Sequence, residues 1–183
     1  MKTPRPIYVS WYETRLGRGA VAASPVGICR VWLPGDDLAE PAALCLTQDE
    51  RTGAAAEQLT RYFQGELISF ELQVDVSGLS SFYQQVLELT MQLPYGSVTS
   101  YGALAARTGR PRAYRAVGGA LRSNPVPIII PCHRVVAASG ALTGFSGPGG
   151  VTMKKLLLSM EGVDMNSIKT AASVKGYAQQ KTC

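Results

Sequence analysis

The sequence predicts a two-domain protein, in which an N-terminal α/β domain is followed by a mainly helical C-terminal domain. Segments rich in β-branched and aromatic residues are concentrated in the first third of the chain, whereas apolar residues at helical spacing dominate after residue 80. A polar stretch with glycine, residues 76–78, separates the two regions. We therefore place the N-terminal domain at residues 1–78, the C-terminal domain at residues 79–163 and a polar tail at residues 164–183. The composition of this tail is compatible with partial disorder.

Three segments and one helix define the N-terminal domain. Residues 7–12 and 26–33 are dense in β-branched and aromatic side chains, which favours strands. A polar connection over residues 36–51 leads to a predicted helix at 54–63, where apolar residues recur every four positions and a glycine follows. Residues 68–74 are predicted to form a further strand.

The C-terminal domain is expected to begin with a helix that ends before residue 94. Ser81 and Gln84 have the spacing of a capping box, and apolar residues follow at helical intervals. Two shorter helices fit residues 101–108 and 112–123, with a glycine in the turn between them. This layout is typical of a helix-turn-helix, although many helix pairs of this kind bind nothing.

The second of these short helices has two different faces. A narrow apolar stripe for packing is formed by Ala113, Val117, Ala120 and Leu121. The other side carries three arginines and two adjacent glycines: Arg112, Arg115, Arg122, Gly118 and Gly119. A glycine inside a helix costs about 1 kcal/mol relative to alanine, so the pair requires a reason. The sequence leaves two open: the close approach of another helix, or that of a nucleic-acid backbone beside the arginines.

Composition excludes several classes of protein. Hydrophobic residues make up 46% of the chain and charged residues 17%, which is ordinary for a globular protein and argues against extensive disorder. No apolar run approaches the ~20 residues of a membrane-spanning helix, so we expect no membrane partner. The N-terminal segment lacks the apolar core of a secretory signal, and a cytoplasmic location is expected. The net charge of +5 is compatible with a polyanionic partner.

The cysteines and the histidine limit the chemistry further. The chain has four cysteines without close pairing, which are expected to be free thiols: Cys29, Cys45, Cys132 and Cys183. The single histidine, His133, excludes a zinc site that uses two histidines.

The most informative segment is residues 128–136. An apolar run, predicted to be a buried strand, leads through a proline into Cys132, His133 and Arg134. A lone cysteine in apolar surroundings is usually an inert core residue, but a neighbouring base can lower the pKa of a thiol. From the residues alone, Cys132 is therefore a candidate nucleophile and no more.

Several blocks of the sequence, in matching order and spacing, resemble the O6-alkylguanine-DNA alkyltransferases. The C-terminal blocks are Pro-Cys-His-Arg-Val at 131–135, Asn-Pro-Val-Pro at 124–127, Arg-Ala-Val-Gly-Gly-Ala at 115–120, and Pro-Tyr-Gly at 94–96 leading to Tyr101. Further matches lie at 75–82, in Thr-Arg-Leu-Gly at 14–17 and in Tyr-Phe-Gln-Gly at 62–65. The resemblance extends to about residue 163. It implies a ribonuclease H-like N-terminal domain and a winged helix-turn-helix C-terminal domain.

The resemblance implies a protein that repairs DNA by direct reversal of damage. It would transfer an alkyl (methyl) group from O6 of guanine in duplex DNA to Cys132, once per molecule and irreversibly, with O4 of thymine as a further candidate target. A thiolate suits this displacement because it is a soft, strong nucleophile. His133 would act as the base through a water, and Glu161 would orient the imidazole. Without the resemblance, Glu161 is an ordinary carboxylate at a helix end.

The partner implied is double-stranded DNA that contains O6-alkylguanine. No cofactor and no metal are implied, and a monomer is expected, associated with the nucleoid if the source is prokaryotic. The target atom lies inside the duplex, so the damaged base must be flipped out of the stack.

By resemblance, the second helix of the helix-turn-helix enters the minor groove. Arg115 would fill the gap left by the flipped nucleotide, Tyr101 would contact the flipped base, and Asn124 would be the hinge before the active-site strand. The other DNA-binding residues implied lie on the same helix: Arg112, Tyr114, Ala116, Gly118, Gly119 and Arg122. Tyr114 departs from the family, where a small residue is common, which puts the DNA approach at this point in doubt.

The loop at residues 137–150 is rich in glycine and serine, and by composition it is a surface loop. The resemblance makes it a wall of the alkylguanine pocket. Phe145 would line the space for the alkyl group, Ser146 would donate a hydrogen bond toward O6, and Pro127 would contact the alkyl group. The backbone carbonyls of the nucleophile and of Val135 would read the exocyclic amine of guanine.

Three other functions compete with this interpretation. A cysteine hydrolase of the Cys-His type would turn over, whereas alkyl transfer consumes the protein. Non-catalytic relatives that bind alkylated DNA replace the cysteine of the Pro-Cys-His-Arg block, and the presence of Cys132 argues against this alternative. A transcription factor is suggested by the helix-turn-helix, but the chain has no room for an additional regulatory domain.

Overall fold

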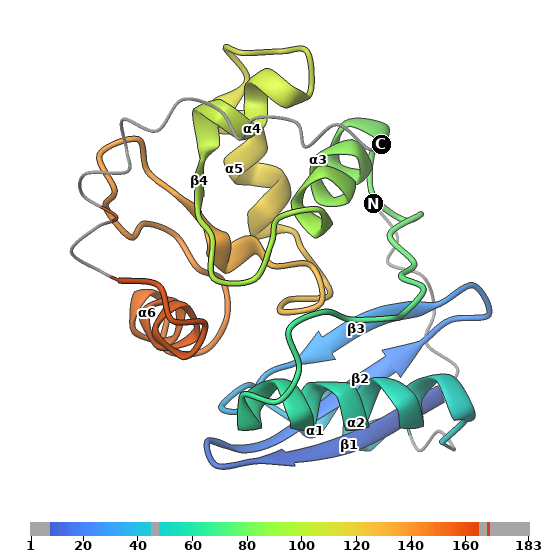
Figure 1. Cartoon of the computed structure of the whole chain (residues 1–183). Coiled ribbons are helices and arrows are strands. Elements are labelled where there is room, and N and C mark those ends of the chain that lie inside the picture. The colour runs from blue at the N-terminus through green and yellow to red at the C-terminus, as the bar shows by residue number, and fades with distance from the viewer. Residues whose placement is uncertain (1–7, 45–47, 165–167, 169–183) are drawn as a thin grey trace, which may run out of the picture.

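The computed structural model describes residues 8–44, 48–164 and 168. A sheet with two helices is built from the N-terminal third, and a group of helices is built from the remainder (Figure 1). None of the described helices is long and apolar enough to cross a membrane. The predictions for Cys45, for Cys183 and for most of the tail at 164–183 concern residues outside this part of the chain.

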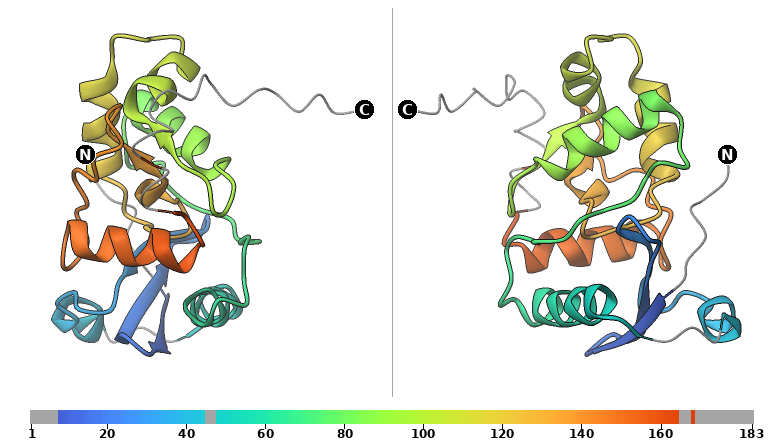
Figure 2. Two further views of the ribbon diagram at one scale, coloured as in Figure 1. Left: turned by 60° about the vertical axis from the view of Figure 1, so that its left-hand side comes forward. Right: turned by 90° about the vertical axis from the view of Figure 1, so that its right-hand side faces the viewer.

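The N-terminal sheet contains three antiparallel strands in the order β1-β2-β3: Tyr8–Thr14, Gly17–Ala23 and Ile28–Trp32. Helices α1 (Ala39–Ala43) and α2 (Glu50–Gln64) lie on opposite sides of this sheet (Figure 2). The prediction of a helix at 54–63 is confirmed, and the helix is longer at its start because Asp49 and Thr52 form a capping box. It ends at Gly65, whose left-handed φ of 80° suits glycine.

Strand β2 is absent from the sequence prediction. Its residues are mostly glycine and alanine, which have low strand propensity. Ala20 and Ala22 contact the small apolar cluster on the α1 side, whereas Val21 and Ala23 belong to the main core on the α2 side. The strand is therefore buried on both faces, where small side chains allow helices to pack closely.

The strand predicted at residues 68–74 is wrong. Within this segment only Val74 forms a β-bridge, and its partner is Ile28. The bridge consists of two backbone hydrogen bonds, from the Ile28 N–H to the Gln73 carbonyl and from the Asp75 N–H to the Ile28 carbonyl. The alternating side chains Phe70 and Leu72 instead pack against the main core from a segment without a hydrogen-bonded ladder. The alternation of apolar residues over 68–74 therefore indicates that alternate side chains are buried, and it does not indicate strand pairing.

The C-terminal part is mainly helical, as predicted. Its elements are α3 (Ser81–Met91), β4 (Thr99–Ser100), α4 (Tyr101–Arg107), α5 (Tyr114–Arg122), the 3-10 turn η1 (Cys132–Arg134), β5 (Val135–Val136) and α6 (Val151–Met160). Strands β4 and β5 pair in parallel. The predicted capping box is wrong by one residue, because Ser80 caps α3 through the backbone N–H of Tyr83, and Gln84 bonds to the carbonyl of Leu79.

The two glycines of α5 have different surroundings in the structure. A Cβ on Gly119 would lie 2.8 Å from the hydroxyl of Tyr83 on α3, so this glycine allows the two helices to approach. A Cβ on Gly118 would lie 3.9 Å from the ring of Tyr101, an ordinary contact. Helix packing therefore accounts for Gly119 but not for Gly118, and both glycines line the cavity described below.

The apolar run before Cys132 is a turn, and the predicted strand there is wrong. Ile128 has a φ of 74°, which is rare for a β-branched residue, and Pro127 and Ile130 form an isolated bridge. Prolines at alternate positions remove the N–H donors that a ladder would need. The Asn124 side chain fixes the turn, because its amide donates to the Ile130 carbonyl (2.9 Å) and its oxygen accepts from the Val126 N–H (3.0 Å).

Candidate active site

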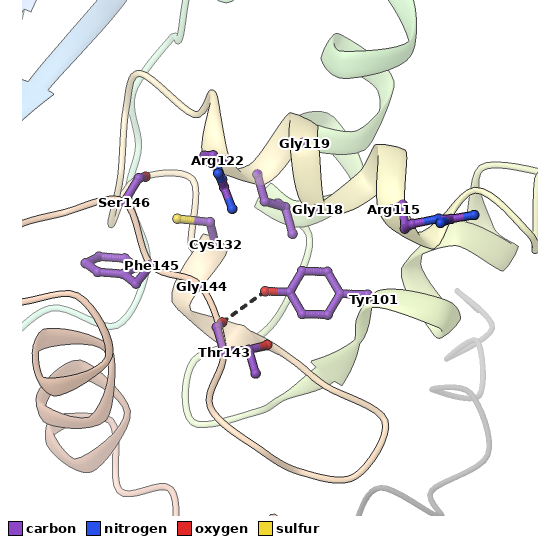
Figure 3. Close-up of a pocket in the computed structure, with 11 residues that line it drawn as sticks. Tyr101, Arg115, Gly118, Gly119, Arg122, Cys132, Thr143, Gly144, Phe145 and Ser146 are labelled. Atoms are coloured by element: carbon purple, nitrogen blue, oxygen red, sulfur yellow. Dashed lines mark hydrogen bonds between the residues drawn. The ribbon is translucent and has the colours of Figure 1, made fainter.

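Cys132 lies at the start of η1, in the wall of a cavity of about 740 Å³. The cavity lies between helix α5, the start of α4 and the loop before α6, and its lining residues are Tyr101, Arg115, Gly118, Gly119, Leu121, Arg122, Cys132, Thr143, Gly144, Phe145 and Ser146. In Figure 3 the sulfur of Cys132 points toward the side formed by Phe145 and Ser146. The cavity thus places a thiol next to an aromatic ring and a hydroxyl.

Cys132 is 7% exposed, and burial raises the pKa of its thiol. The Asn124 amide and the ammonium of Lys154 offset part of this increase. Lys154 is fully buried and donates to the carbonyls of Val135 (2.6 Å) and Thr143 (3.0 Å). Burial lowers the pKa of Lys154 to about 8. At rest the site therefore holds a protonated thiol beside a buried cation.

His133 is fully buried and points away from bulk water. Its Nε2 lies 2.7 Å from Oε1 of Glu161, and an ionised carboxylate can only accept, so Nε2 carries the proton. Nδ1 is buried and has no hydrogen-bond partner among the residues that the structure describes. Burial lowers the pKa of His133, although Glu161 opposes this effect. The imidazole is thus neutral at pH 7, with Nδ1 available as an acceptor.

Glu161 follows α6 and is surrounded by donors. Its Oε2 accepts from Nε of Arg134 (2.8 Å) and from the backbone N–H of Gly96 (3.1 Å), and its Oε1 accepts from Nη2 of Arg134 (2.9 Å). The hydroxyl of Tyr62 also donates to Oε1 (2.8 Å). Burial favours a higher pKa, but the bonds from His133 and Arg134 outweigh it and hold the pKa of Glu161 at about 2.

The sequence analysis missed several residues around this carboxylate. Arg134 pairs with Glu161 through two nitrogens, and its Nη1 donates to the Leu93 carbonyl (2.5 Å). Arg134 and Tyr62 both lie inside blocks that carry the resemblance, but nothing in those blocks shows that they meet. Lys154 has the sequence context of an ordinary surface lysine. Only the tertiary arrangement brings these groups to the site.

The predicted pocket residues divide between two adjacent hollows. Tyr101 lines the cavity and donates its hydroxyl to the Thr143 carbonyl (3.1 Å). Phe145 and Ser146 line the same cavity. Pro127 instead lines a neighbouring hollow of about 490 Å³, which shares Arg122 and Ser146 with the first. The side chain of Val135 is buried away from both.

The outer surface of α5 is exposed and basic. The residues expected to contact DNA are exposed at Arg112, just before the helix, and at Tyr114, Arg115, Ala116 and Arg122 on it, whereas Gly118 and Gly119 are partly buried. The guanidinium of Arg115 lies 5.9 Å from the ring of Tyr114 and extends away from Cys132 (Figure 3). Because Arg115 and Arg122 also line the cavity that contains Cys132, the basic surface of α5 adjoins the nucleophile.

Comparison with known proteins agrees with this geometry. Residues 7–76 match the ribonuclease-like domain of 6-O-methylguanine DNA methyltransferase, and residues 81–163 match its DNA-binding domain. A methylated-DNA–protein-cysteine methyltransferase from Methanosarcina acetivorans is 36% identical over 157 residues, which cover 85% of this chain and 99% of that protein. One from Mycolicibacterium paratuberculosis is 44% identical over 127 residues, which cover 69% of this chain and 75% of that protein.

A solved structure gives the same result in three dimensions. The crystal structure of Mycobacterium tuberculosis OGT in complex with DNA has a TM-score of 0.72 and 32% identity, over 88% of this chain and 99% of that one. Both domains of this chain are thus matched in sequence and in fold. From its buried Cys-His-Glu arrangement, its exposed basic helix and these matches, we conclude that the chain belongs to the 6-O-methylguanine DNA methyltransferase family.

Proposed function

We propose that the protein repairs double-stranded DNA by moving an alkyl group from O6 of guanine to Sγ of Cys132. The bond between the alkyl carbon and O6 breaks while the S–C bond forms, and guanine leaves with its O6 restored. The thioether is stable, so each molecule reacts once. The observation that carries this proposal is a thiol in the wall of a cavity beside a neutral histidine whose acceptor nitrogen is free.

His133 acts as the base in this proposal. The thiol proton passes through a bridging water to Nδ1, and Glu161 holds Nε2–H and stabilises the imidazolium that forms. The burial that raises the pKa of Cys132 keeps the thiol protonated until substrate is bound. After the transfer, the proton held by the imidazolium is available to the leaving guanine.

Helix α5 binds DNA in the minor groove in this proposal, because its exposed face is basic and close to the cavity. Arg115 fills the gap left by the flipped base, and Tyr101 contacts that base and the adjacent phosphate. Asn124 maintains the turn that carries the nucleophile. Contacts with the backbone come from Arg112, Tyr114, Ala116, Gly118, Gly119 and Arg122.

The alkylguanine pocket is the cavity at Cys132. Phe145 contacts the alkyl group and Ser146 donates toward O6, since both line the cavity. Pro127 contributes from the adjoining hollow. The carbonyl of Val135, which also accepts from Lys154, reads the exocyclic amine of guanine in this proposal.

Finer features of the protein belong to the same proposal. The antiparallel sheet with α2 supports a ribonuclease H-like N-terminal domain, and the pair β4–β5 beside α4 and α5 supports a winged helix-turn-helix. We place the domain boundary after residue 78 and the end of the catalytic domain at 163. A monomer in the cytoplasm, at the nucleoid in a prokaryote, suits a chromosomal substrate.

The test uses a duplex oligonucleotide with one O6-methylguanine. The wild-type protein is expected to repair one base per molecule and then stop, whereas Cys132→Ala should repair none and bind the duplex with nearly unchanged affinity. Repair of many bases per molecule would indicate a hydrolase instead. Loss of folding in Cys132→Ala would indicate that the cysteine has a structural role instead.

A further inference from the structure

One side chain from the N-terminal domain reaches the proposed catalytic groups. Tyr62 lies on α2, and its hydroxyl is 2.8 Å from Oε1 of Glu161 and 3.4 Å from Nε2 of His133. Tyr62 is 1% exposed, so solvent does not compete for these contacts. Tyr62 and Glu161 are 99 positions apart in the sequence, and the contact therefore depends on how the two halves of the molecule pack.

Packing alone does not account for this hydroxyl. The ring of Tyr62 contacts Phe63, Phe70 and Tyr95, with centroid separations of 5.6, 5.7 and 6.4 Å, and a phenylalanine would fill the same space. A buried hydroxyl costs free energy unless it is hydrogen-bonded. Its partners are the carboxylate and, at longer range, the imidazole of the proposed reaction.

We propose that Tyr62 is a positioning residue for alkyl transfer, which acts by holding Oε1 of Glu161 against Nε2–H of His133. The bond fixes the tautomer in which Nδ1 is free to accept the proton of Cys132. The proposal rests on the function proposed above, and it assigns a direct part in the reaction to the N-terminal domain.

The charged groups around the pair give the direction of the effect. Glu161 faces Arg134, His133, Tyr62 and the Gly96 N–H, and His133 also faces the ammonium of Lys154. Tyr62 itself faces Tyr95 as well as Glu161 and Arg134. Removal of the hydroxyl takes one donor from the carboxylate, which then attracts Nε2–H more strongly. The imidazolium becomes more favourable, and the pKa of His133 rises.

The test compares Tyr62→Phe with Tyr12→Phe. Tyr12 lies in the same domain, is 2% exposed and donates to the Trp32 carbonyl (2.9 Å), so its variant also loses one buried hydroxyl bond away from the site. For Tyr62→Phe we expect single-turnover repair to slow by about tenfold and its acidic limb to move to higher pH. Tyr12→Phe should retain the wild-type rate and profile. Equal rates and profiles in both variants would overturn the proposal.

A second measurement does not depend on the rate. His133 is the only histidine in the chain, so ¹⁵N-histidine NMR reports its tautomer and pKa directly. Tyr62→Phe should raise this pKa, and an unchanged titration would contradict the proposal. In a Glu161→Gln background, Tyr62→Phe should have little additional effect on the rate, and an equal further loss would show that Tyr62 acts independently of the carboxylate.

The controls separate this proposal from the function on which it rests. If His133→Ala reacts at the wild-type rate, the proposed base is wrong, whatever Tyr62 does. If His133→Ala is slow but Tyr62→Phe matches Tyr12→Phe in rate and in the NMR titration, only the role of Tyr62 fails.

Discussion

At the scale of single residues, neither the nucleophile nor the proposed base is charged before the reaction. Glu161 is ionised, but Arg134 neutralises it through a pair of hydrogen bonds, and burial keeps both Cys132 and His133 uncharged. Because Arg134 neutralises Glu161, the carboxylate stabilises a protonated His133 less than an unpaired carboxylate would. Thiolate formation is therefore expected to accompany substrate binding.

The pH dependence of transfer follows from this neutral state. The pKa of His133 is lowered from its ordinary value of 6.5, so the base is unprotonated at neutral pH and protonates only under more acidic conditions. The single-turnover rate of the wild-type protein should stay constant from neutral pH down to below 6.5 and then fall. His133→Ala should be slower by about 10²–10⁴-fold and lose this acidic limb, while it binds DNA normally. A wild-type rate that already declines above pH 6.5 would contradict a buried neutral base.

The nucleophile, base and acid were predictable from the sequence only through the resemblance. Spacing alone left Cys132 open between an inert core residue and a nucleophile. Arg134 and Tyr62 were not predicted, because their roles depend on contacts with Glu161 over sequence separations of 27 and 99 residues. Buried polar networks of this kind arise from tertiary packing, which local patterns do not encode.

At the scale of elements, helix α5 combines packing with recognition. Val117, Ala120 and Leu121 are buried, whereas Arg115 and Arg122 are exposed. The predicted apolar stripe is confirmed at these three buried positions, because a period of 3.6 residues identifies a buried helical face, but Ala113 precedes the helix and is only partly buried. Most of the errors concern strands. Strand β2 was missed, and the apolar segments at 68–74 and 128–130 are not strands, since alternation and apolarity also occur in buried chain without a ladder. Helix α1 was also missed, because it lies in the segment predicted as a polar connection.

The two glycines of α5 should respond differently to alanine. Gly118→Ala should increase the free energy of unfolding by about 1 kcal/mol, because the new Cβ meets only ordinary contacts and the helix becomes stiffer. Gly119→Ala should gain less, because the Cβ would press on the hydroxyl of Tyr83. Urea denaturation measures both, and Tyr83→Phe combined with Gly119→Ala should recover the gain. Equal stabilisation by both alanines would contradict the packing role of Gly119.

Two nearby arginines, Arg115 on α5 and Arg112 in the turn before it, offer a matched test of base flipping. Arg115 lines the cavity, whereas Arg112 does not. Arg115→Ala should greatly slow repair in duplex DNA and spare reaction with free O6-benzylguanine, because extrusion of a base costs a few kcal/mol and a planar cation can fill the gap. Arg112→Ala should mainly weaken binding, and more protein should restore its rate.

The outcomes for Arg115 distinguish three roles. Equal slowing with both substrates would place the defect in the pocket itself. Rescue of Arg115→Ala by higher protein concentration would make Arg115 an electrostatic contact with phosphate. Either result would remove it from the flipping step.

At the scale of the whole molecule, the net charge of +5 and the basic face of α5 predict binding that depends on salt and little on sequence. The logarithm of the affinity should fall linearly with the logarithm of salt concentration, with a slope of about −0.9 per phosphate neutralised. Titration of a fluorescent duplex at several salt concentrations measures the slope, and Arg112→Ala should reduce it by about one phosphate's contribution. An affinity that does not change with salt would exclude docking through this face.

The two halves of the molecule jointly build the site. Tyr62 from α2 contacts Glu161 after α6, and α6 lies between α2 and the helices α3–α5 in both views of Figure 2. The two-domain class was predictable from composition and periodicity, but this junction was not, because it depends on the packing of residues that are remote in sequence. The N-terminal domain is therefore expected to affect the reaction itself as well as stability.

The central claim is that Cys132 receives the alkyl group. Its most direct test is mass spectrometry of the protein after reaction with a duplex that contains one O6-methylguanine, followed by peptide mapping. The account predicts one added methyl per molecule, on Cys132, with Cys29 unmodified. A methyl group on another residue, or repaired DNA together with an unmodified protein, would contradict it.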